Sequence, residues 1–244
     1  MTHWLDIIRR TLSDPAFQTA GRLALIFGDP AHRAANLCTD AGMHVVRASV
    51  LHGVAVRRFE SGASEMTIRA DAGALPFRDA TFDLVIAHAT VEFTHDDRQV
   101  IGELARVLRV GGHLIVRLPR WGRLAAIDAL NLYRYSREIL GKGEIPPESL
   151  PIGWRRHYKQ ADLDAIFDRP ELFVTSVVSG GLGLGEVLYW PGLVLTRSVL
   201  PRPALAQRLR ETYARLGDLD ERLPGPSTLV VTALRRDCNV ACLP

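Results

Sequence analysis

Short apolar segments alternate with helical segments through the first half of the chain, and this alternation limits the folds open to it. Segments typical of strands occur at 23–27, 44–49, 65–70, 82–88 and 113–118. Stretches with helical spacing occur at 4–20, 31–41 and 96–109, and a short helix is expected at 50–59. Strands that alternate with helices form a parallel sheet with right-handed crossovers. The sequence therefore predicts an α/β fold.

The second half of the chain is less regular. We expect helices at 124–140 and 160–167, a proline-containing loop at 141–153, and strands at 173–179 and 228–235 with a mostly helical stretch between them. No internal repeat and no long linker divides the chain, so we expect one domain over 1–244. Its core would comprise about 20–120 and 160–236, with cap insertions at about 121–159 and 182–226.

Composition and charge exclude several classes of protein. Hydrophobic residues make up 47% of the 244 residues, which is enough to build a core. The formal net charge is +3, and lysine occurs only at Lys142 and Lys159 among 30 basic residues. The arginines are scattered in pairs with acids between them rather than gathered into one stripe. Nucleic-acid binding is therefore not expected.

The cysteines predict neither a disulfide scaffold nor a metal site. Cys38, Cys238 and Cys242 are too few for such a scaffold, and their odd number fits a reducing compartment. Cys238 and Cys242 have no second pair and no histidine beside them, as a zinc site would need. The first ten residues contain acid and arginine where a signal peptide needs an apolar core. We therefore expect a cytoplasmic protein.

One largely apolar stretch, 172–200, bears on membrane binding. Glu186, several glycines and Pro191 interrupt it, whereas a spanning helix needs about 20 apolar residues in a row. We expect a strand followed by an amphipathic or cap helix. A peripheral membrane contact stays open, because tryptophan and tyrosine suit an interface. Its candidate residues are Leu188, Tyr189, Trp190 and Leu193.

A resemblance to a known family appears in the middle of the chain. The segments 71–85, 92–93 and 103–116 resemble class I S-adenosylmethionine-dependent methyltransferases, in particular the small-molecule group typified by ubiquinone and sterol methyltransferases. The resemblance implies a Rossmann-like, seven-stranded, mostly parallel sheet with a C-terminal antiparallel hairpin, here with helical cap insertions. In such open sheets the ligand lies beyond the carboxyl ends of the strands, where the strand order reverses.

The resemblance also implies a cofactor, S-adenosylmethionine, and the residues that would hold it. In the family, the pair at Asp71 and Ala72 flanks the adenine. The other residues follow the first, second and fourth expected strands along the chain. The expected cofactor-binding residues are Gly28, Asp29, Ser49, Asp71, Ala72 and His88.

The chain departs from the family at two places that matter for this cofactor. The family's first strand ends in an acid and a turn with three glycines, but Ile26 stands here for the acid and only Gly28 remains of the glycines. Pro30 and His32 replace the others, so the turn loses a backbone N–H and gains side chains. The family's second strand ends in an acid that binds the ribose, where this chain has Ser49. We expect an impaired site.

Two functions from different classes stay open. The altered turn slightly favours a non-catalytic binding or accessory protein, with a small molecule, a protein partner or a second copy as its ligand. The alternative is a methyltransferase that acts on a small or lipid-like molecule through an altered cofactor site.

Histidines and aromatic residues supply the candidates for chemistry. His88 and His157 are candidate bases, because methyl transfer to oxygen or nitrogen needs a proton acceptor within reach. A group of aromatic and basic residues could hold an acidic aromatic or isoprenoid substrate, or could equally be a capping surface with solvated arginines. The group comprises Trp121, Trp154, Arg155, Arg156 and Tyr158.

Overall fold

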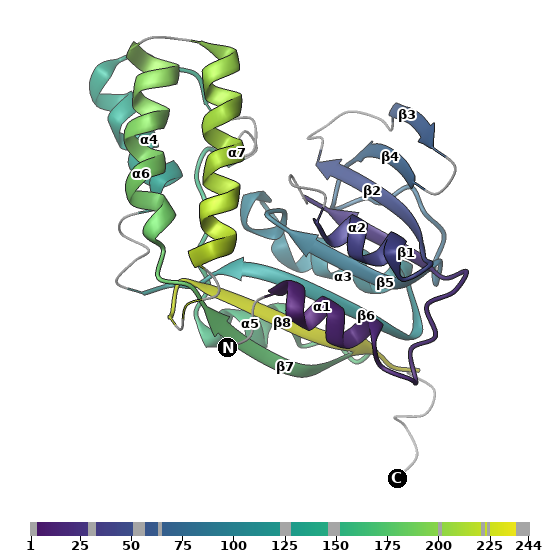
Figure 1. Ribbon diagram of the computed structural model, residues 1–244. Helices are drawn as coiled ribbons and strands as arrows, with labels where there is room; N and C mark the ends of the chain where they lie inside the picture. The colour runs from purple at the N-terminus through teal and green to yellow at the C-terminus, as the bar shows by residue number, and fades with distance from the viewer. Residues whose placement is uncertain are drawn as a thin grey trace.

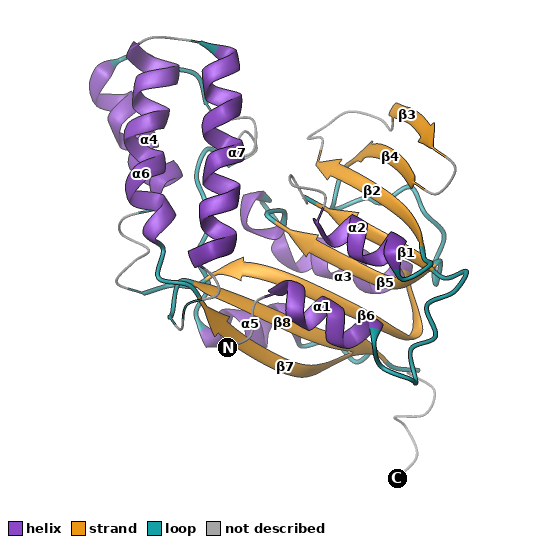
Figure 2. Ribbon diagram, viewed as in Figure 1, coloured by secondary structure: helices purple, strands orange, loops and turns teal. Residues whose placement is uncertain are grey.

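The computed structural model describes residues 4–28, 33–50, 57–62, 65–122, 128–145, 152–199, 202–220, 223 and 225–237. Within these residues the strands form one eight-stranded sheet in the order β3-β4-β2-β1-β5-β6-β8-β7 (Figure 2). Strands β4, β2, β1, β5 and β6 run parallel, and β8 runs antiparallel between β6 and β7. The strands are β1 (Leu23–Phe27), β2 (His44–Val50), β3 (Arg57–Gly62), β4 (Glu65–Ala70), β5 (Phe82–His88), β6 (Leu108–Pro119), β7 (Leu172–Gly180) and β8 (Thr228–Arg235).

Helices cover both faces of this sheet. Leu25 and Phe27 of β1 belong to the apolar cluster that includes α3 and α5, whereas Ala24 and Ile26 belong to the cluster that includes α1 and α2. A central strand buried on both faces accounts for the unbroken apolar run in its sequence. The helices are α1 (Trp4–Leu12), α2 (Arg33–Asp40), η1 (Val91–Phe93), α3 (Asp97–Val107), α4 (Ala129–Leu140), α5 (Gln160–Phe167), α6 (Leu184–Leu193), η4 (Val194–Val199) and α7 (Pro203–Asp220).

The expected mostly parallel sheet and its C-terminal antiparallel hairpin are confirmed, with one correction at the edge. A short helix was expected at 50–59, but residues 57–62 form β3, which pairs antiparallel with β4. This pairing satisfies backbone groups that β4 would otherwise leave open, so tertiary hydrogen bonds decide the conformation. The sheet consequently has eight strands rather than seven. Residues 51–56 lie outside the described part of the chain.

The first helix is shorter than expected. It ends at Leu12 rather than at residue 20. Pro15 follows, and the Asp14 carboxylate accepts a hydrogen bond from the Ala16 N–H at 2.9 Å, which closes a turn. Proline disfavours helical geometry in the residue before it, so the chain leaves the helix here.

Helices α4, α6 and α7, with η4, form a separate helical layer that stands on one end of the sheet (Figure 1). They come from the two stretches that were expected to be cap insertions. Their own small core contains Leu130, Tyr133, Tyr189 and Leu193, together with Phe93 from the segment after β5. We call this layer the cap. None of the helices in the described ranges is both long and apolar enough to cross a bilayer.

The close approach of β1 and β5 at Gly28 allows a sharp test of the fold. Gly28 has a φ of +66°, and a Cβ on it would lie 1.7 Å from the His88 carbonyl oxygen. Gly28→Ala should therefore cost roughly 3 kcal/mol or more of unfolding free energy, measured by urea denaturation. Gly21→Ala is the matched control, because Gly21 has a φ of +73° and no atom within 4 Å. It should cost only about 1 kcal/mol; equal losses would refute this account of Gly28.

Candidate functional site

The carboxyl ends of four parallel strands meet at one edge of the sheet. Phe27 of β1 lies opposite Ala48 of β2 and Ala87 of β5. Four of the residues expected at the cofactor site, Gly28, Ser49, Asp71 and His88, follow directly after these positions or after β4. Ser49 and Asp71 are exposed, and Ala72 is fully buried. Asp29 lies outside the described residues.

His88 is held by the fold at the point where the strand order reverses. Its Nδ1 lies 2.8 Å from the Gly28 carbonyl oxygen, so Nδ1 carries the proton, because a carbonyl only accepts. The ring stacks on Trp4 of α1, with 4.9 Å between ring centroids. The Thr90 hydroxyl donates to the His88 carbonyl oxygen. These contacts give His88 a structural task at the edge between β1 and β5.

The loop that carries Asp71 and Ala72 is ordered by its own hydrogen bonds. Asp71 Oδ1 accepts from the Gly73 N–H at 2.8 Å. The Gln99 side chain on α3 donates to the Gly73 carbonyl oxygen at 2.8 Å. The Asp71 carboxylate is consequently set at the exposed end of β4 before any ligand arrives.

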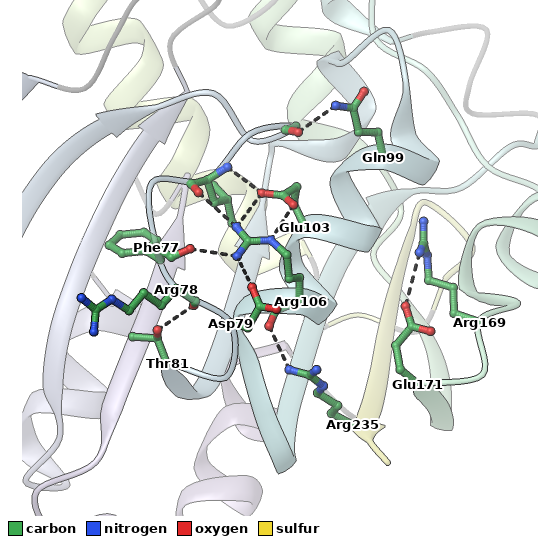
Figure 3. A network of polar contacts seen from close by, with 12 residues as sticks. Phe77, Arg78, Asp79, Thr81, Gln99, Glu103, Arg106, Arg169, Glu171 and Arg235 are labelled. Carbon is green, nitrogen blue, oxygen red and sulfur yellow. Dashed lines mark hydrogen bonds and ion pairs between the residues drawn. The ribbon is translucent and has the colours of Figure 1, made fainter. Parts of the chain in front are cut away.

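Arg106 of α3 fixes the rest of this loop (Figure 3). Its guanidinium donates to the carbonyl oxygens of Leu75 and Phe77 and to the carboxylates of Asp79 and Glu103. Glu103 in turn accepts from the Leu75 N–H. The hydrogen bond from Arg106 lowers the pKa of Glu103, although partial burial opposes this. The loop therefore packs firmly against α3.

A pocket of about 320 Å³ lies between α4 of the cap, the residues just after β6 and the segment 154–157. Trp121 comes shortly after β6. Its backbone N–H donates to the Tyr158 carbonyl oxygen, so the segment 152–158 lies beside the residues that follow β6. The segment after β5 reaches the cap, because Ala89 and Phe93 pack with the cap core. The pocket is lined by Trp121, Gly122, Asn131, Leu132, Arg134, Tyr135, Trp154, Arg155 and His157.

A buried charge network forms one wall of this pocket. Arg155 pairs with Asp128, which precedes α4, and with Glu186 of α6. Tyr213 of α7 donates to Glu186 and lies 3.4 Å from Arg155 Nη1. Burial would lower the pKa of Arg155, but the two carboxylates hold it well above its ordinary value. The network ties three cap elements to the segment 152–158.

His157 extends the same network. Its Nε2 lies 3.3 Å from Asp128 Oδ2, and both side chains are buried. Burial would raise the pKa of Asp128, but Arg155 and His157 together lower it, so the carboxylate stays ionised. Because a carboxylate only accepts, the proton of a neutral His157 lies on Nε2, which leaves Nδ1 as the acceptor.

The structure brings together some of the expected pocket residues and separates others. Trp121, Trp154, Arg155 and His157 line one pocket. Arg156 instead pairs with Asp97 of α3, with its guanidinium 5.9 Å from the Trp154 ring centroid.

Tyr158, also expected at the pocket, lies in the core of the sheet at 1% exposure. The sequence did not predict the partners of Arg155, which lie far from it along the chain: Asp128, Glu186 and Tyr213. The one available signal was a carboxylate inside the apolar run at Glu186. A charge in such a run needs a buried partner.

Arg155 is also unavailable for the acidic substrate that was considered above. Its guanidinium already contacts two carboxylates, so the network has no positive charge to spare for a third. The exposed wall of the pocket is built from the aromatic rings of Trp121 and Tyr135. Arg134, the other arginine of the lining, is paired with Glu138. A neutral, largely apolar ligand therefore suits the lining better than an anion.

The residues considered for a peripheral membrane contact occupy other places. Tyr189 stacks on Tyr213 with 4.0 Å between ring centroids, and Leu193 is 1% exposed. Trp190 is partly exposed and donates to Ser136. Tyr189 and Leu193 face the cap core because α6 packs on both α4 and α7, so that surface assignment was wrong. The side chain of Leu188 lies outside the described set.

The described residues hold no cluster of three or more histidine, cysteine, aspartate or glutamate side chains placed to bind a metal ion. Cys38 lies on α2 and is fully buried in the core. Cys238 and Cys242 lie beyond the last described residue.

Comparison with known sequences agrees with the geometry of this edge. Residues 30–116 match the family described as a methyltransferase domain. The chain is also similar to the ubiquinone/menaquinone biosynthesis C-methyltransferase UbiE of Xylella fastidiosa, with 34% identity over 102 residues. That match covers 33% of this chain and 39% of the relative, so the chain matches well under half of the relative's length.

Solved structures show the same fold over nearly the whole chain. A methyltransferase-like protein from Bacillus halodurans has a TM-score of 0.57 and 13% identity, and the match covers 94% of this chain and 99% of that one. A Burkholderia thailandensis didemethyltoxoflavin N1-methyltransferase, solved with its substrate and S-adenosylhomocysteine, has a TM-score of 0.51 and 14% identity, covering 96% and 81%. The fold is thus that of class I methyltransferases.

Removal of Arg155 should test the charge network. Arg155→Met would leave two buried carboxylates without their cation, at a cost of about 3–5 kcal/mol in unfolding free energy. Arg134→Met removes an exposed pair with Glu138 and should cost less than about 1 kcal/mol. Urea denaturation of both variants measures the difference. Equal losses would mean that the network does not hold the cap.

Glu92 and Glu103 should make stability depend on pH in opposite directions. Burial raises the pKa of Glu92 above 4.5, so its contribution is complete below 4.5 and is lost as pH rises through the folded pKa. Arg106 lowers the pKa of Glu103, so its contribution is present above 4.5 and is lost as pH falls through the folded pKa. We therefore expect the melting temperature of Glu92→Gln to rise relative to that of the wild type between about pH 3 and about pH 8. Over the same range the melting temperature of Glu103→Gln should fall relative to that of the wild type. Parallel curves for all three proteins would contradict both assignments.

Proposed function

We propose that this class I methyltransferase-fold chain is an S-adenosylmethionine-dependent methyltransferase whose acceptor is a small, largely apolar molecule bound under the cap. The observation that carries the proposal is the pocket of about 320 Å³ that Trp121 and Gly122, just after the carboxyl end of β6, form together with α4 and the segment 154–157. Its volume is in the range of small-molecule sites, and its buried polar groups stand at one wall. Ligands of open α/β sheets bind at this edge.

The residues at the edge fit the cofactor in part. Asp71 offers an exposed carboxylate and Ser49 an exposed hydroxyl, which can accept hydrogen bonds from a nucleoside. S-adenosylmethionine, when bound, supplies a methyl group on a sulfonium sulfur. Asp71 is held by Gly73 and the α3 contacts, so it would orient the nucleoside end. Gly28 lets the end of β1 lie close to the end of β5 at this edge of the sheet.

His157 is the proposed proton acceptor. Asp128 orients the imidazole by contacting its Nε2, as a carboxylate commonly does for a histidine base. Nδ1 is then the atom that would take a proton from the molecule being methylated. Arg155 keeps Asp128 ionised and in place. His88, by contrast, has its Nδ1 on the Gly28 carbonyl oxygen and is better suited to a positioning role.

The pocket lining supports an aromatic or lipid-like acceptor. Trp121, Tyr135 and Trp154 supply flat apolar surfaces, and the one guanidinium in the network is already neutralised. The name of the Xylella relative, a ubiquinone/menaquinone biosynthesis C-methyltransferase, agrees with such an acceptor. A hydroquinone with a short isoprenoid tail is therefore the first acceptor to test.

A non-catalytic binding protein is the second candidate, and one contact favours it. The stacked rings of Trp4 and His88 occupy the point of strand-order reversal where a cofactor's reactive end would be expected. In addition, Ile26 is buried in the core, so the first strand has no carboxylate at that position. Under this reading the pocket under the cap binds its ligand without methyl transfer.

Calorimetric titration with S-adenosylmethionine and S-adenosylhomocysteine separates the two candidates. We expect micromolar binding that weakens about 10-fold or more in Asp71→Ala, because a charge-assisted hydrogen bond is lost. Asp164→Ala removes an exposed carboxylate on α5 and should bind as the wild type does. Absence of heat at millimolar nucleoside would contradict the enzyme and favour the second candidate.

A turnover assay then tests His157. With the isoprenoid hydroquinone as acceptor, S-adenosylhomocysteine formation should fall about 100-fold or more in His157→Gln. Nucleoside affinity should stay unchanged, because His157 lies in the pocket rather than at the Asp71 end of the edge. Unchanged turnover would remove His157 from the mechanism.

A further inference from the structure

The far end of the cap gathers three elements that are separate in the sequence. The end of α4, the η4 turn and the start of α7 meet at the top of the cap in Figure 1. The Ser198 hydroxyl donates to the Lys142 carbonyl oxygen at 3.3 Å and lies 3.1 Å from the Tyr133 hydroxyl. A Cβ on Gly143 would lie 2.3 Å from the Ser198 oxygen, so the segments are in close contact. We call residues 134–145, 194–199 and 202–208 the cap tip.

The cap tip exposes large apolar side chains that the cap core leaves out. Single exposed leucines are ordinary on protein surfaces. Here five exposed aliphatic residues belong to one end of one helical layer, and such a concentration marks an interaction surface. The five are Ile139, Leu140, Leu195, Val199 and Leu205, exposed by between 42% and 85%.

The same tip concentrates positive charge. Its described residues include six cations and two carboxylates, a net of four positive charges, whereas the whole chain has a formal net charge of +3. The rest of the chain is therefore close to neutral. The cations are Arg134, Arg137, Lys142, Arg197, Arg202 and Arg208, and the carboxylates are Glu138 and Glu144.

One face of α4 connects the tip with the pocket under the cap. Leu132 and Tyr135 line the pocket, and Ile139 lies four residues after Tyr135. Residues three and four apart lie on the same side of a helix. An apolar strip therefore runs from the pocket lining to the most exposed aliphatic side chain of the tip, Ile139.

We propose that the cap tip docks on the surface of an anionic lipid bilayer. The five aliphatic side chains enter the boundary between headgroups and acyl chains, and the surrounding arginines and Lys142 contact lipid phosphates. Charge decides between a bilayer and a second copy of the chain. Two tips with four net positive charges each repel one another, whereas an anionic surface attracts the tip. The described helices are too short or too polar to span, so the contact is peripheral.

Vesicle co-sedimentation tests this proposal without cofactor or acceptor. The full chain is mixed with vesicles of phosphatidylcholine alone, or of phosphatidylcholine with 30–40% phosphatidylglycerol (about one anionic lipid in three), at low and at high salt. We expect binding to the anionic vesicles that weakens at least 10-fold at high salt. The Ile139→Glu, Leu195→Glu double variant should bind at least 10-fold more weakly than the wild type.

The matched control is Leu219→Glu, which places the same charge on an exposed leucine at the opposite end of α7. It should bind vesicles as the wild type does, and circular dichroism should show all proteins folded. The proposal is overturned if the wild type stays in solution with anionic vesicles at low salt, or if the double variant binds as well as the control. A wild-type dimer that the double variant abolishes, without vesicle binding, would assign the tip to a second copy instead.

Discussion

The close backbone approach of β1 and β5 at Gly28 is the constraint on which the functional edge depends. A side chain there would overlap the His88 carbonyl oxygen, so only glycine lets the two central strands end side by side. His88 then reaches back to the Gly28 carbonyl oxygen, and Trp4 covers its ring. The segment after β5 leaves this point to join the cap core. One turn thus fixes where β5 ends and where the segment that joins the cap core begins.

The buried network around Arg155 decides what kind of pocket lies between the cap and the sheet. Buried charges are expensive unless they are paired, and here one guanidinium serves two carboxylates and a tyrosine hydroxyl. The pairing holds α4, α6 and α7 against the segment 152–158. The same pairing neutralises Arg155, so its positive charge is not available to bind an acidic ligand. The pocket therefore has aromatic walls and one polar wall whose charges are already paired, which suits a largely apolar ligand.

Much of the fold could be predicted because its information is local. The strands at 23–27, 65–70, 82–88 and 228–235 begin and end where they were expected, because an apolar run or a regular alternation of apolar and polar residues is a local signal of a strand. The strand at 57–62 was missed, because it is stabilised by pairing with β4 rather than by its own pattern. The same limit applies to the pocket. Trp121 and His157 were candidates because of their residue type and their position in the sequence, and both line the pocket. Tyr158 was also a pocket candidate, but its side chain packs in the core of the sheet.

By itself, the sequence determined the alternation of strands and helices, the resemblance to methyltransferases and the residues at the ends of the strands, because each depends on neighbours within a few positions. Only the tertiary structure decided how the charges pair. Arg155 meets Glu186, 31 residues away, and Arg156 meets Asp97, 59 residues away, on different elements. Whether an arginine binds a ligand or a carboxylate depends on which distant segments fold against it. Local pattern carries no information about that choice.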